Sequence, residues 1–395
     1  MDSNRRQFLQ KASALAAAPA FVPRGAFGAN EKLSYALIAA GGRGRYLNKV
    51  FQKYGTQCVA VCDVYEPNIE LALKDSPGAR TYIDYHELLD KEKSLDFVVL
   101  AGPDHHHCPM LLASLAAGKD AYAEKPLSYS LQESAKMVKA VRESRQIVQI
   151  GMQRRSADVI KSAKKLVDDG ALGRIAMVKP MWNWNIARPL NNSPLPGKID
   201  WERFLGSAPK RPLEPMRIRS WRTFWDYAGG NMTDQGTHLM DVVLWFTNSG
   251  PPLSALCYGQ VIMNEGSEHP NVFCAVFEFP SFVATWTLNY CNSFQDGWSI
   301  TFQGDKGTMI VDEDGYRVYK EPWRERPNRE PIYLAKVPVE VDAHIENFLS
   351  CIKTREQPNC TVEIAANAVA GPHLANIALQ KGCKARLMPD GNVVT

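Results

Sequence analysis

The 395-residue sequence lacks the features of a membrane-spanning, disulfide-framed or nucleic-acid-binding protein. Beyond its first residues, no stretch is apolar enough to fill the roughly 20 positions that a bilayer-spanning helix needs. Nine cysteines are present, but the number is odd and none has C-x-x-C spacing, which argues against a disulfide framework. There is also no basic stripe to attract nucleic acid. We therefore expect no membrane span in the mature chain and no nucleic-acid partner.

The N-terminus has the composition of an export signal. Arg5 and Arg6 precede a short, alanine-rich apolar run at residues 12–22, as in a twin-arginine signal. Residues 1–29 hold four basic residues and one acidic residue, so without them the formal charge falls from +4 to +1. We expect cleavage near residues 26–29, export in folded form by the twin-arginine machinery, and a periplasmic or otherwise extracytoplasmic mature protein.

Length and composition indicate a globular protein of two domains. Hydrophobic residues make up 45% and charged residues 22% of the chain. We predict an α/β fold with a Rossmann domain at residues 30–152 and an α+β domain for substrate and oligomer contacts at residues 153–395. The first domain should have a parallel sheet, because three apolar runs alternate with helical segments: 33–39, 57–62 and 95–101.

A glycine-rich segment after the first apolar run has the spacing of a dinucleotide fingerprint. Ala39 takes the first position of G-x-G-x-x-G, and Gly41 and Gly44 take the second and third. The middle glycine lets the backbone approach a pyrophosphate, the last allows close helix packing, and the helix N-terminus attracts the anion. We expect Gly41, Gly42, Arg43 and Gly44 to contact the cofactor, before a helix predicted from Tyr46 to Tyr54.

An acid follows the second apolar run. Asp63 lies 22 residues after Gly41, where a carboxylate suits the ribose hydroxyls of NAD and would repel the 2′-phosphate of NADP. We favour NAD, with NADP left open. The structural alternative for Asp63 is a turn cap.

Polar residues also follow the third apolar run. Pro103 precedes His105, His106 and His107, just before a helix predicted to begin at Cys108. Adjacent histidine side chains diverge and have no partner at ligand spacing, so we expect no metal. Pro103 and His107 are candidates to line the nicotinamide pocket.

The segment Glu124-Lys125-Pro126 ends the next strand at the same predicted edge. A lysine held on a proline turn can polarise a substrate hydroxyl, because its ammonium is a compact charge. The structural alternative is a solvated loop lysine.

The second half is rich in tryptophan, with eight of the nine between Trp182 and Trp298. The period of a strand places Trp182 and Trp184 on one face. Two interpretations stay open for this pair: stacking on a sugar, and packing within a sheet or subunit interface.

A second candidate group lies on the helix predicted to open at residues 231–241. Asp234 and His238 are four residues apart and therefore neighbours on a helix, and Asp241 falls on the same face. A histidine beside a carboxylate can accept a hydroxyl proton, while the carboxylate fixes its tautomer. The pair could instead brace the helix. Beyond it we predict an open, mostly antiparallel sheet and two closing helices at residues 344–355 and 363–380.

Taken together, these motifs resemble those of the glucose-fructose oxidoreductase and inositol dehydrogenase family (Gfo/Idh/MocA). The resemblance rests on Glu124-Lys125-Pro126, Asp234-x-x-x-His238, Gly102–His107 and Gln153-Arg154-Arg155, and covers nearly all of the mature chain. These motifs are specific for the family and poorly specific for the substrate.

The resemblance implies a role for each matching residue. Lys125 would orient the reacting hydroxyl, His238 would be the general base and Asp234 would position His238, while the proline of the motif is commonly cis. Glu124 and Lys125 would also border the cofactor, and hydride would pass to the nicotinamide. Further substrate contacts are expected from Trp182, Trp184, Arg154 and Asp241.

Two enzymatic functions follow from this resemblance. The first is an exported, NAD-dependent oxidoreductase acting on a sugar, polyol or glycoside. The alternative is a glycoside hydrolase that uses retained NAD for transient oxidation, elimination and reduction. In either case we expect tightly bound NAD, because an exported enzyme has no soluble nicotinamide supply, and a homo-oligomer.

Overall fold

The computed structural model describes residues 32–322 and 330–395. The predicted export signal at residues 1–29 lies outside these ranges, as does Trp323. Residues Leu33–Thr395 form one compact unit.

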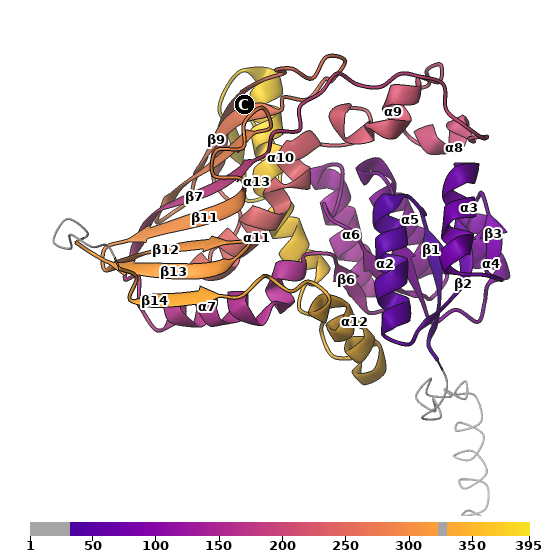
Figure 1. The fold of residues 1–395 in the computed structure, drawn as a ribbon, viewed down its shortest axis with the longest axis horizontal. Coiled ribbons are helices and arrows are strands. Elements are labelled where there is room, and N and C mark those ends of the chain that lie inside the picture. The colour runs from indigo at the N-terminus through magenta and orange to yellow at the C-terminus, as the bar shows by residue number, and fades with distance from the viewer. Residues whose placement is uncertain (1–31, 323–329) are drawn as a thin grey trace, which may run out of the picture. The chain divides into compact units, whose positions relative to one another are not determined.

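The first half of the unit is built on a six-stranded parallel sheet of order β3-β2-β1-β4-β5-β6. This confirms the predicted Rossmann sheet (Figure 1). The strands are apolar and mostly buried, as expected of strands covered on both faces. Their bounds are β1 (Ser34–Ile38), β2 (Gln57–Cys62), β3 (Arg80–Tyr82), β4 (Phe97–Leu100), β5 (Asp120–Ala123) and β6 (Val148–Ile150).

Five helices connect these strands: α2 (Gly42–Lys53), α3 (Glu66–Asp75), α4 (Tyr85–Lys91), α5 (Asp104–Ala116) and α6 (Leu131–Glu143). Two of them begin earlier than predicted. Helix α2 starts at Gly42 rather than Tyr46, so the fingerprint glycines form its first turn. Helix α5 starts at Asp104 rather than Cys108, so the three histidines belong to the helix and not to a preceding loop.

A mainly helical stretch leads from the first sheet to the second. It contains one long strand, β7 (Ile175–Asn183), which joins the second sheet. The helices before and after it are η1 (Gln153–Ser156), α7 (Asp158–Asp168), α8 (Trp201–Leu205), α9 (Pro215–Arg219), η2 (Trp221–Thr223), α10 (Gly230–Asp234) and α11 (Gly236–Thr247). Helices α8 and α9 reach across to the α3 and β3 side of the first sheet (Figure 1).

The second sheet has ten strands in the order β14-β13-β12-β11-β7-β10-β9-β8-β15-β16. All its described pairings are antiparallel except β7 with β10, which confirms the predicted mostly antiparallel sheet. The remaining strands are β8 (Ser254–Gln260), β9 (Val272–Glu278), β10 (Val283–Asn289), β11 (Gly297–Gly304), β12 (Gly307–Asp312), β13 (Gly315–Lys320), β14 (Tyr333–Lys336), β15 (Ala385–Leu387) and β16 (Val393–Val394).

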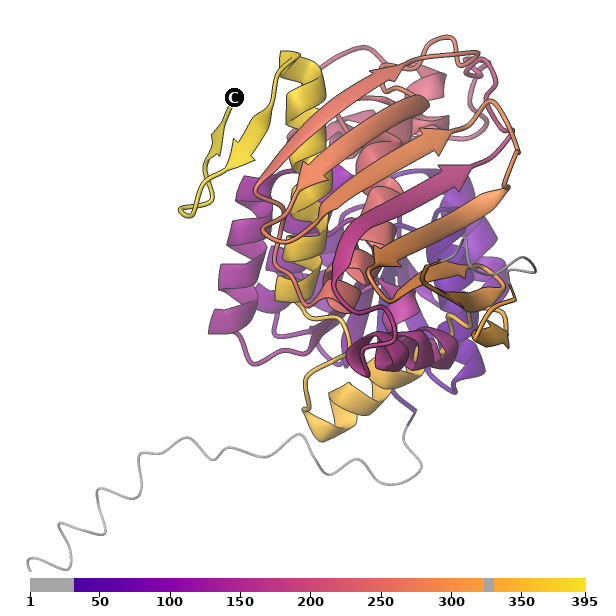
Figure 2. The same ribbon diagram turned by 90° about the vertical axis from the view of Figure 1, so that its left-hand side faces the viewer.

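One face of the second sheet carries the core and the other is uncovered. Buried and exposed residues alternate along β9 and β10, the pattern of a half-buried sheet. In Figure 2 the sheet faces the viewer and most helices lie behind it. Apolar side chains such as Leu256, Tyr258 and Val276 remain exposed.

Two helices near the C-terminus return to the first sheet. Helices α12 (Ala343–Thr354) and α13 (Val362–Lys381) match the two predicted closing helices to within two residues. Phe348 of α12 packs with Phe51 and Phe97, whereas Val362 and Val369 of α13 join the core with α5 and α6. Helices α12 and α13, which come much later in the chain, therefore complete the hydrophobic cores on the two faces of the first sheet.

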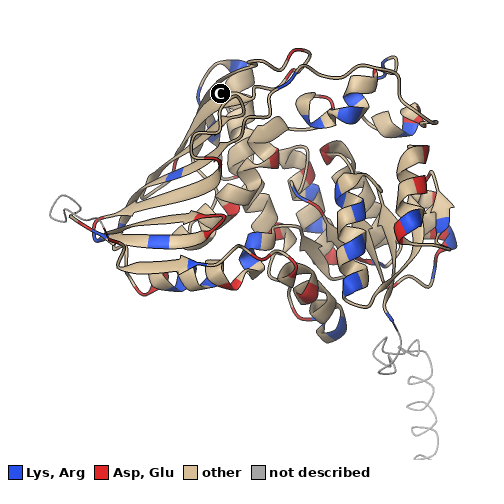
Figure 3. Ribbon diagram, in the orientation of Figure 1, with Lys and Arg blue, Asp and Glu red and all other residues tan. Residues whose placement is uncertain are grey.

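Helix apolarity, cysteine state and charge distribution can each be described from the structure. Among the described residues, no helix has the length and apolarity needed to cross a membrane. The nine cysteines, all within the described ranges, are free thiols. Basic and acidic positions are interspersed along the ribbon in Figure 3.

Candidate active site

The turn between β1 and α2 has the shape of a dinucleotide-binding loop despite its missing first glycine. Ala39 adopts a positive φ of 70°, the left-handed conformation that glycine adopts most easily. A Cβ on Gly44 would overlap the carbonyl oxygen of Ala39, so only glycine allows the helix to approach this closely. The turn thus keeps the shape of a dinucleotide-binding loop, although Ala39 must adopt a backbone conformation that is unfavourable for alanine.

Asp63 stands directly beside this turn at the end of β2. Its carboxylate accepts hydrogen bonds from the backbone N–H groups of Ala40 (2.7 Å) and Tyr65 (2.8 Å) and from Asn68 Nδ2 (3.2 Å). Burial raises the pKa of Asp63 to about 6, although these hydrogen bonds oppose the shift. Asp63 therefore braces the glycine turn, which was the structural alternative, and also lines the adjoining cavity.

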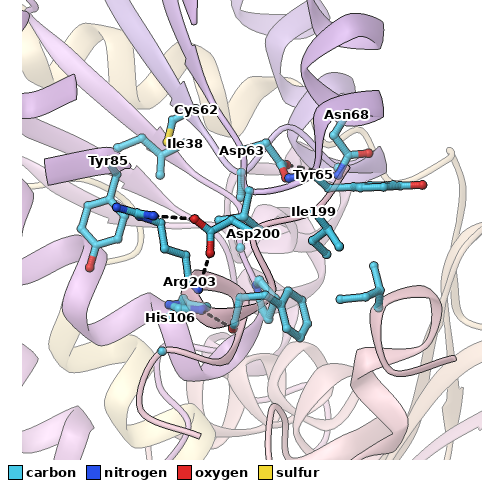
Figure 4. A pocket seen from close by; sticks show the side chains of 18 of the residues that line it. Ile38, Cys62, Asp63, Tyr65, Asn68, Tyr85, His106, Ile199, Asp200 and Arg203 are labelled. Atoms are coloured by element: carbon cyan, nitrogen blue, oxygen red, sulfur yellow. Dashed lines mark hydrogen bonds and ion pairs between the residues drawn. The ribbon is translucent and has the colours of Figure 1, made fainter. Parts of the chain in front are cut away.

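That cavity, which we call the outer cavity, has a volume of about 1120 Å³. Its inner wall includes Gly41, Gly42, Asp63 and Pro103, as the sequence predicted. Its other wall comes from residues between 195 and 222 of the second half. Figure 4 shows residues of both walls around the cavity, with Ile199 beside Tyr65 and Asp63 and Asn68 close by. The glycine turn, the N-terminus of α2 and the acid at β2 fit a dinucleotide.

Lys125 lies at the same edge of the sheet, after β5. The Lys125–Pro126 bond is cis, as the resemblance implied. Lys125 Nζ donates to the backbone carbonyl of Asp234 (2.8 Å) and to its carboxylate (2.7 Å). Since an ammonium has three N–H bonds, one donor remains for another group. The side chain is 12% exposed, so Lys125 is not the solvated loop lysine of the structural alternative.

Glu124 is buried next to Lys125 and forms an ion pair with Arg43. Arg43 Nη2 lies 2.8 Å from Glu124 Oε1, and Nε donates to the same oxygen at 2.9 Å. The pair ties the first turn of α2 to the end of β5. Both predicted cofactor residues thus lie together, beside Lys125.

Asp234 does not have the partner that the sequence predicted for it. Its Oδ1 pairs with Lys125 and with Arg222 Nε (3.1 Å), and among the described residues it forms no hydrogen bond or ion pair with His238. Helix α10 ends at Asp234 and α11 begins at Gly236, so the two side chains do not share one continuous helical face. Burial raises the pKa of Asp234, but the charges of Lys125 and Arg222 outweigh it and hold that pKa well below its usual range. Asp234 therefore positions Lys125 rather than His238.

His238 lies near Lys125 with a free ring nitrogen. Its Nδ1 is buried and has no hydrogen-bond partner within the described part of the chain. Burial, together with the charges of Lys125, Arg154 and Arg43, lowers the pKa of His238 well below its usual range. The ring is therefore neutral at physiological pH and able to accept a proton.

These groups enclose a second, smaller cavity of about 230 Å³, which we call the inner cavity. It is lined by Arg43, Glu124, Lys125, Gln153, Asp234 and His238, and it shares Ala101, Gly102, Trp221 and Arg222 with the outer cavity. A group that fills the outer cavity would therefore reach the charged residues of the inner one.

His107 is not where the sequence suggested. The residue is only 1% exposed and lines neither cavity. Its ring nitrogens lie 2.6 Å from Pro126 O and 2.8 Å from Gly102 O, so it braces the loop that carries Lys125. Within the described ranges, no group of three His, Cys, Asp or Glu side chains is arranged to hold a metal ion.

The four expected substrate residues are also placed away from the inner cavity. Trp182 is buried in the core of the second sheet and Trp184 stacks on Tyr290, which favours the packing interpretation for both. The guanidinium of Arg154 lies over the rings of Trp298 (4.1 Å) and Trp182 (5.4 Å). Asp241 is buried in an ion pair with Arg155 (2.7 Å). None of the four lines either cavity, because core packing determines their position.

Two site residues were not found from the sequence. Trp221 and Arg222 line both cavities, and the guanidinium of Arg222 lies 4.1 Å from the Trp221 ring centroid while pairing with Asp234. They belong to no recognisable motif, and only the local density of arginine and tryptophan at residues 219–226 marks the segment.

Two family models match the chain. The model for the NAD-binding Rossmann fold of an oxidoreductase family (GFO_IDH_MocA) matches residues 33–152. The model for the C-terminal alpha/beta domain of the same family matches residues 164–376.

Curated relatives match over part of the chain. An inositol 2-dehydrogenase of Salmonella typhimurium is 31% identical over 126 residues, which is 31% of this chain and 37% of that protein. An inositol 2-dehydrogenase of Rhodococcus erythropolis is 32% identical over 38% of this chain and 44% of its own length. The matches thus span less than half of these relatives.

Solved structures match over nearly the whole chain. The WlbA dehydrogenase from Bordetella pertussis, in complex with NADH and UDP-GlcNAcA, has a TM-score of 0.69 at 20% identity and covers 91% of this chain and 99% of its own. A levoglucosan dehydrogenase in complex with NADH and levoglucosan has a TM-score of 0.70 at 16% identity, over 90% of this chain and 99% of its own. At these identities the likeness shows the fold.

Proposed function

Because the chain belongs to the Gfo/Idh/MocA oxidoreductase family, we propose that it oxidises a hydroxyl group of a sugar, polyol or glycoside with NAD as the hydride acceptor. The observation that carries this proposal is the junction of the two cavities. The outer cavity has the glycine turn and the acid expected of a dinucleotide site, and it opens onto Lys125 and His238.

Different residues of the outer cavity would bind different parts of NAD. Gly41 and Gly42, at the start of α2, would face the pyrophosphate, and Asp63 would face the ribose hydroxyls. When bound, NAD supplies the hydride acceptor. The same carboxylate disfavours a 2′-phosphate, which supports NAD over NADP.

Lys125 and His238 would divide the work on the substrate. Lys125 keeps one N–H free of its two contacts with Asp234, and this donor orients the reacting hydroxyl oxygen. His238 lines the same cavity and would accept the hydroxyl proton as the carbon loses its hydride. The ion pair with Asp234 holds Lys125 in place.

The class of substrate follows from the chemistry of the inner cavity and from the relatives. Seven of the ten residues that line the inner cavity are polar or charged, which suits a compound with many hydroxyl groups. The relatives are named as dehydrogenases of inositol and levoglucosan. These names favour a dehydrogenase over the glycoside hydrolase alternative.

The cellular setting is also part of the proposal. Arg5-Arg6 and the apolar run after them support export by the twin-arginine route to the periplasm or another extracytoplasmic space. Such an enzyme would carry its NAD with it. The uncovered apolar face of the second sheet supports a homo-oligomer.

The test is a turnover assay on the purified protein with saturating NAD. Inositols, aldoses, anhydrosugars and nitrophenyl glycosides are added one at a time, and the absorbance of reduced nicotinamide is followed. We expect at least one polyhydroxylated compound to reduce NAD, and Lys125→Ala to abolish this signal. Release of nitrophenol without net nicotinamide reduction would instead identify the hydrolase, and no reaction with any compound would contradict the proposal.

A further inference from the structure

A segment of the second half forms part of the cofactor site in a way that no motif indicates. Residues 195–207, which we call the strap, lie between β7 and α9 and include α8. They line the outer cavity opposite the glycine turn and Asp63 (Figure 4). The strap does more than pass nearby, because several contacts fix it to the first half.

The strap is fixed first at the end of β2. Tyr65 and Ile199 form an antiparallel β-bridge. This bridge consists of the hydrogen bonds from Asp200 N to Val64 O (2.8 Å) and from Glu66 N to Lys198 O (2.9 Å), and Tyr65 Oη also donates to Pro196 O (2.7 Å). A short two-stranded connection therefore closes over the position of Asp63.

A second attachment lies at the starts of α4 and α5. Arg203 Nη2 lies 3.3 Å from the carboxylate of Asp84, and the same guanidinium pairs with Asp200. The carbonyl oxygen of Phe204 lies 2.8 Å from His106 Nε2 and 2.9 Å from His105 Nε2. The strap thus spans the loops that follow β2, β3 and β4.

Two glycines of the strap fit it closely to these loops. Gly197 and Gly206 both have positive φ, at 71° and 54°. A Cβ at Gly197 would lie 2.6 Å from Pro67 Cγ, and one at Gly206 would lie 2.6 Å from His106 Cε1. At these two glycines the backbone of the strap therefore lies directly against the side chains of Pro67 and His106.

The attachments lie at the carboxyl ends of β2, β3 and β4, the edge at which a Rossmann sheet binds its ligand. On the proposed NAD-dependent function, the adenosine half of NAD would lie between Asp63 and the strap. We propose that the strap completes the adenosine subsite and holds NAD through successive turnovers. NAD would then leave only when the strap contacts break.

The charges of the strap agree with an adenosine that carries no 2′-phosphate. Arg203 is the basic residue of the strap that reaches α4, and it is already paired with Asp84 and Asp200. Asp63 lines the same cavity, so three carboxylates accompany this guanidinium. A 2′-phosphate would have to displace a carboxylate from Arg203 or remain close to all three, so the strap should hold NAD better than NADP.

The test measures how fast the loaded protein releases NADH. Wild-type protein is saturated with NADH and mixed with excess NAD, and the loss of bound-NADH fluorescence gives the release rate. Gly197→Val introduces a Cβ against Pro67 at a positive φ, and we expect release at least tenfold faster. Arg203→Ala removes one attachment and should accelerate release by a few fold. Lys161→Ala, which removes an exposed pair with Asp158 on α7, outside the strap, is the matched control and should leave the rate unchanged.

Substrate is absent from this experiment, so its result is independent of the turnover assay. Equal release rates in wild type, Gly197→Val and Arg203→Ala would overturn the role of the strap even if a sugar is oxidised. Failure of wild-type protein to bind NADH would overturn it as well. If Gly197→Val does not fold, Arg203→Ala and Tyr65→Phe against Lys161→Ala give the same comparison.

Discussion

The outer and inner cavities meet at Gly102, Trp221 and Arg222, but different kinds of chemical group surround them. The outer cavity is about five times larger, at about 1120 Å³ against about 230 Å³. The hydrogen bonds that fix the strap and the glycine turn around it involve largely backbone groups. The inner cavity consists mainly of paired side-chain charges, with Arg43 against Glu124 and Lys125 against Asp234. Binding and chemistry are thus separated within one cleft.

This separation has an energetic reason. A long ligand such as a dinucleotide is held by many modest contacts, so the loss of one is tolerated. A proton and a hydride move at a single carbon, so that reaction depends on a few groups whose charge and position are fixed. Substitutions in the inner cavity should therefore change catalysis and leave NAD bound, whereas those in the outer cavity should do the reverse.

The largest effect is expected from Lys125→Ala. Loss of the donor that orients the hydroxyl should lower kcat/KM by about 10²- to 10⁴-fold, the range for a positioned acid–base group. NADH affinity, measured by fluorescence titration, should change by no more than a few fold. Lys161→Ala, a half-exposed lysine paired with Asp158 on α7, is the control. Parallel loss of NADH binding and turnover in Lys125→Ala would break the proposed division of roles.

The converse substitution is Gly44→Ala, in the turn that borders the outer cavity. Its Cβ would overlap Ala39 O, so the glycine turn must shift away from α2. We expect a loss of about 1–3 kcal/mol of unfolding free energy, as in an overpacked core, and at least tenfold weaker NADH binding. Gly250→Ala, which has open space around its Cβ, is the control for thermal unfolding and NADH titration. Unchanged binding in Gly44→Ala would show that the turn is not fixed by this contact.

The two cavities also differ in how far the sequence predicts them. The glycine turn and Asp63 belong to one β-α-β unit, where local spacing determines the geometry. Lys125 follows from the same reasoning, because it ends a neighbouring parallel strand. The parallel strands of the first sheet and the two closing helices were likewise predictable from apolar periodicity.

Contacts between distant segments could not be predicted in this way. Asp234 pairs with Lys125, 109 residues away, rather than with His238, which is only four residues away. His107 bonds to Pro126 O and Gly102 O, and Trp182 lies in a core that forms only when β7 meets β11. The strap has no motif at all, since its hydrogen bonds are mostly from the backbone, which sequence does not encode residue by residue.

Acidification should affect both cavities together. Burial lowers the pKa of seven histidines, among them His105 and His106 beside the strap and His238 in the inner cavity. Each must take up a proton on unfolding below the ordinary value of about 6.5, so their stabilisation is complete above that pH and is lost below it. The loss approaches about 1.4 kcal/mol per histidine for each further pH unit.

Thermal unfolding at pH 7.5, 6.5 and 5.5 checks this direction. We expect Tm to fall between pH 6.5 and 5.5. Four carboxyl groups act in the opposite sense, because burial raises the pKa values of Asp241 and Glu133 and those of Asp63 and Asp104 to about 6 and about 7, but they are four groups against seven. A Tm that rises on acidification would show that these carboxyls outweigh the histidines.

The smallest effect concerns the one residue of the fingerprint that departs from glycine. Ala39 has a φ of 70°, so Ala39→Gly should relieve strain and raise the unfolding free energy by about 1 kcal/mol, less the extra entropy of glycine in the unfolded chain. Ala40→Gly is the matched control: Ala40 is fully buried, does not have a positive φ, and should lose stability of about that size. Both variants keep the backbone N–H that Asp63 accepts, so NADH affinity should change little. Chemical denaturation measures the unfolding free energy of both variants. If the two variants are equally destabilised, the turn is held by its side chains rather than by its backbone. The difference between the two cavities would then be smaller than their contacts indicate.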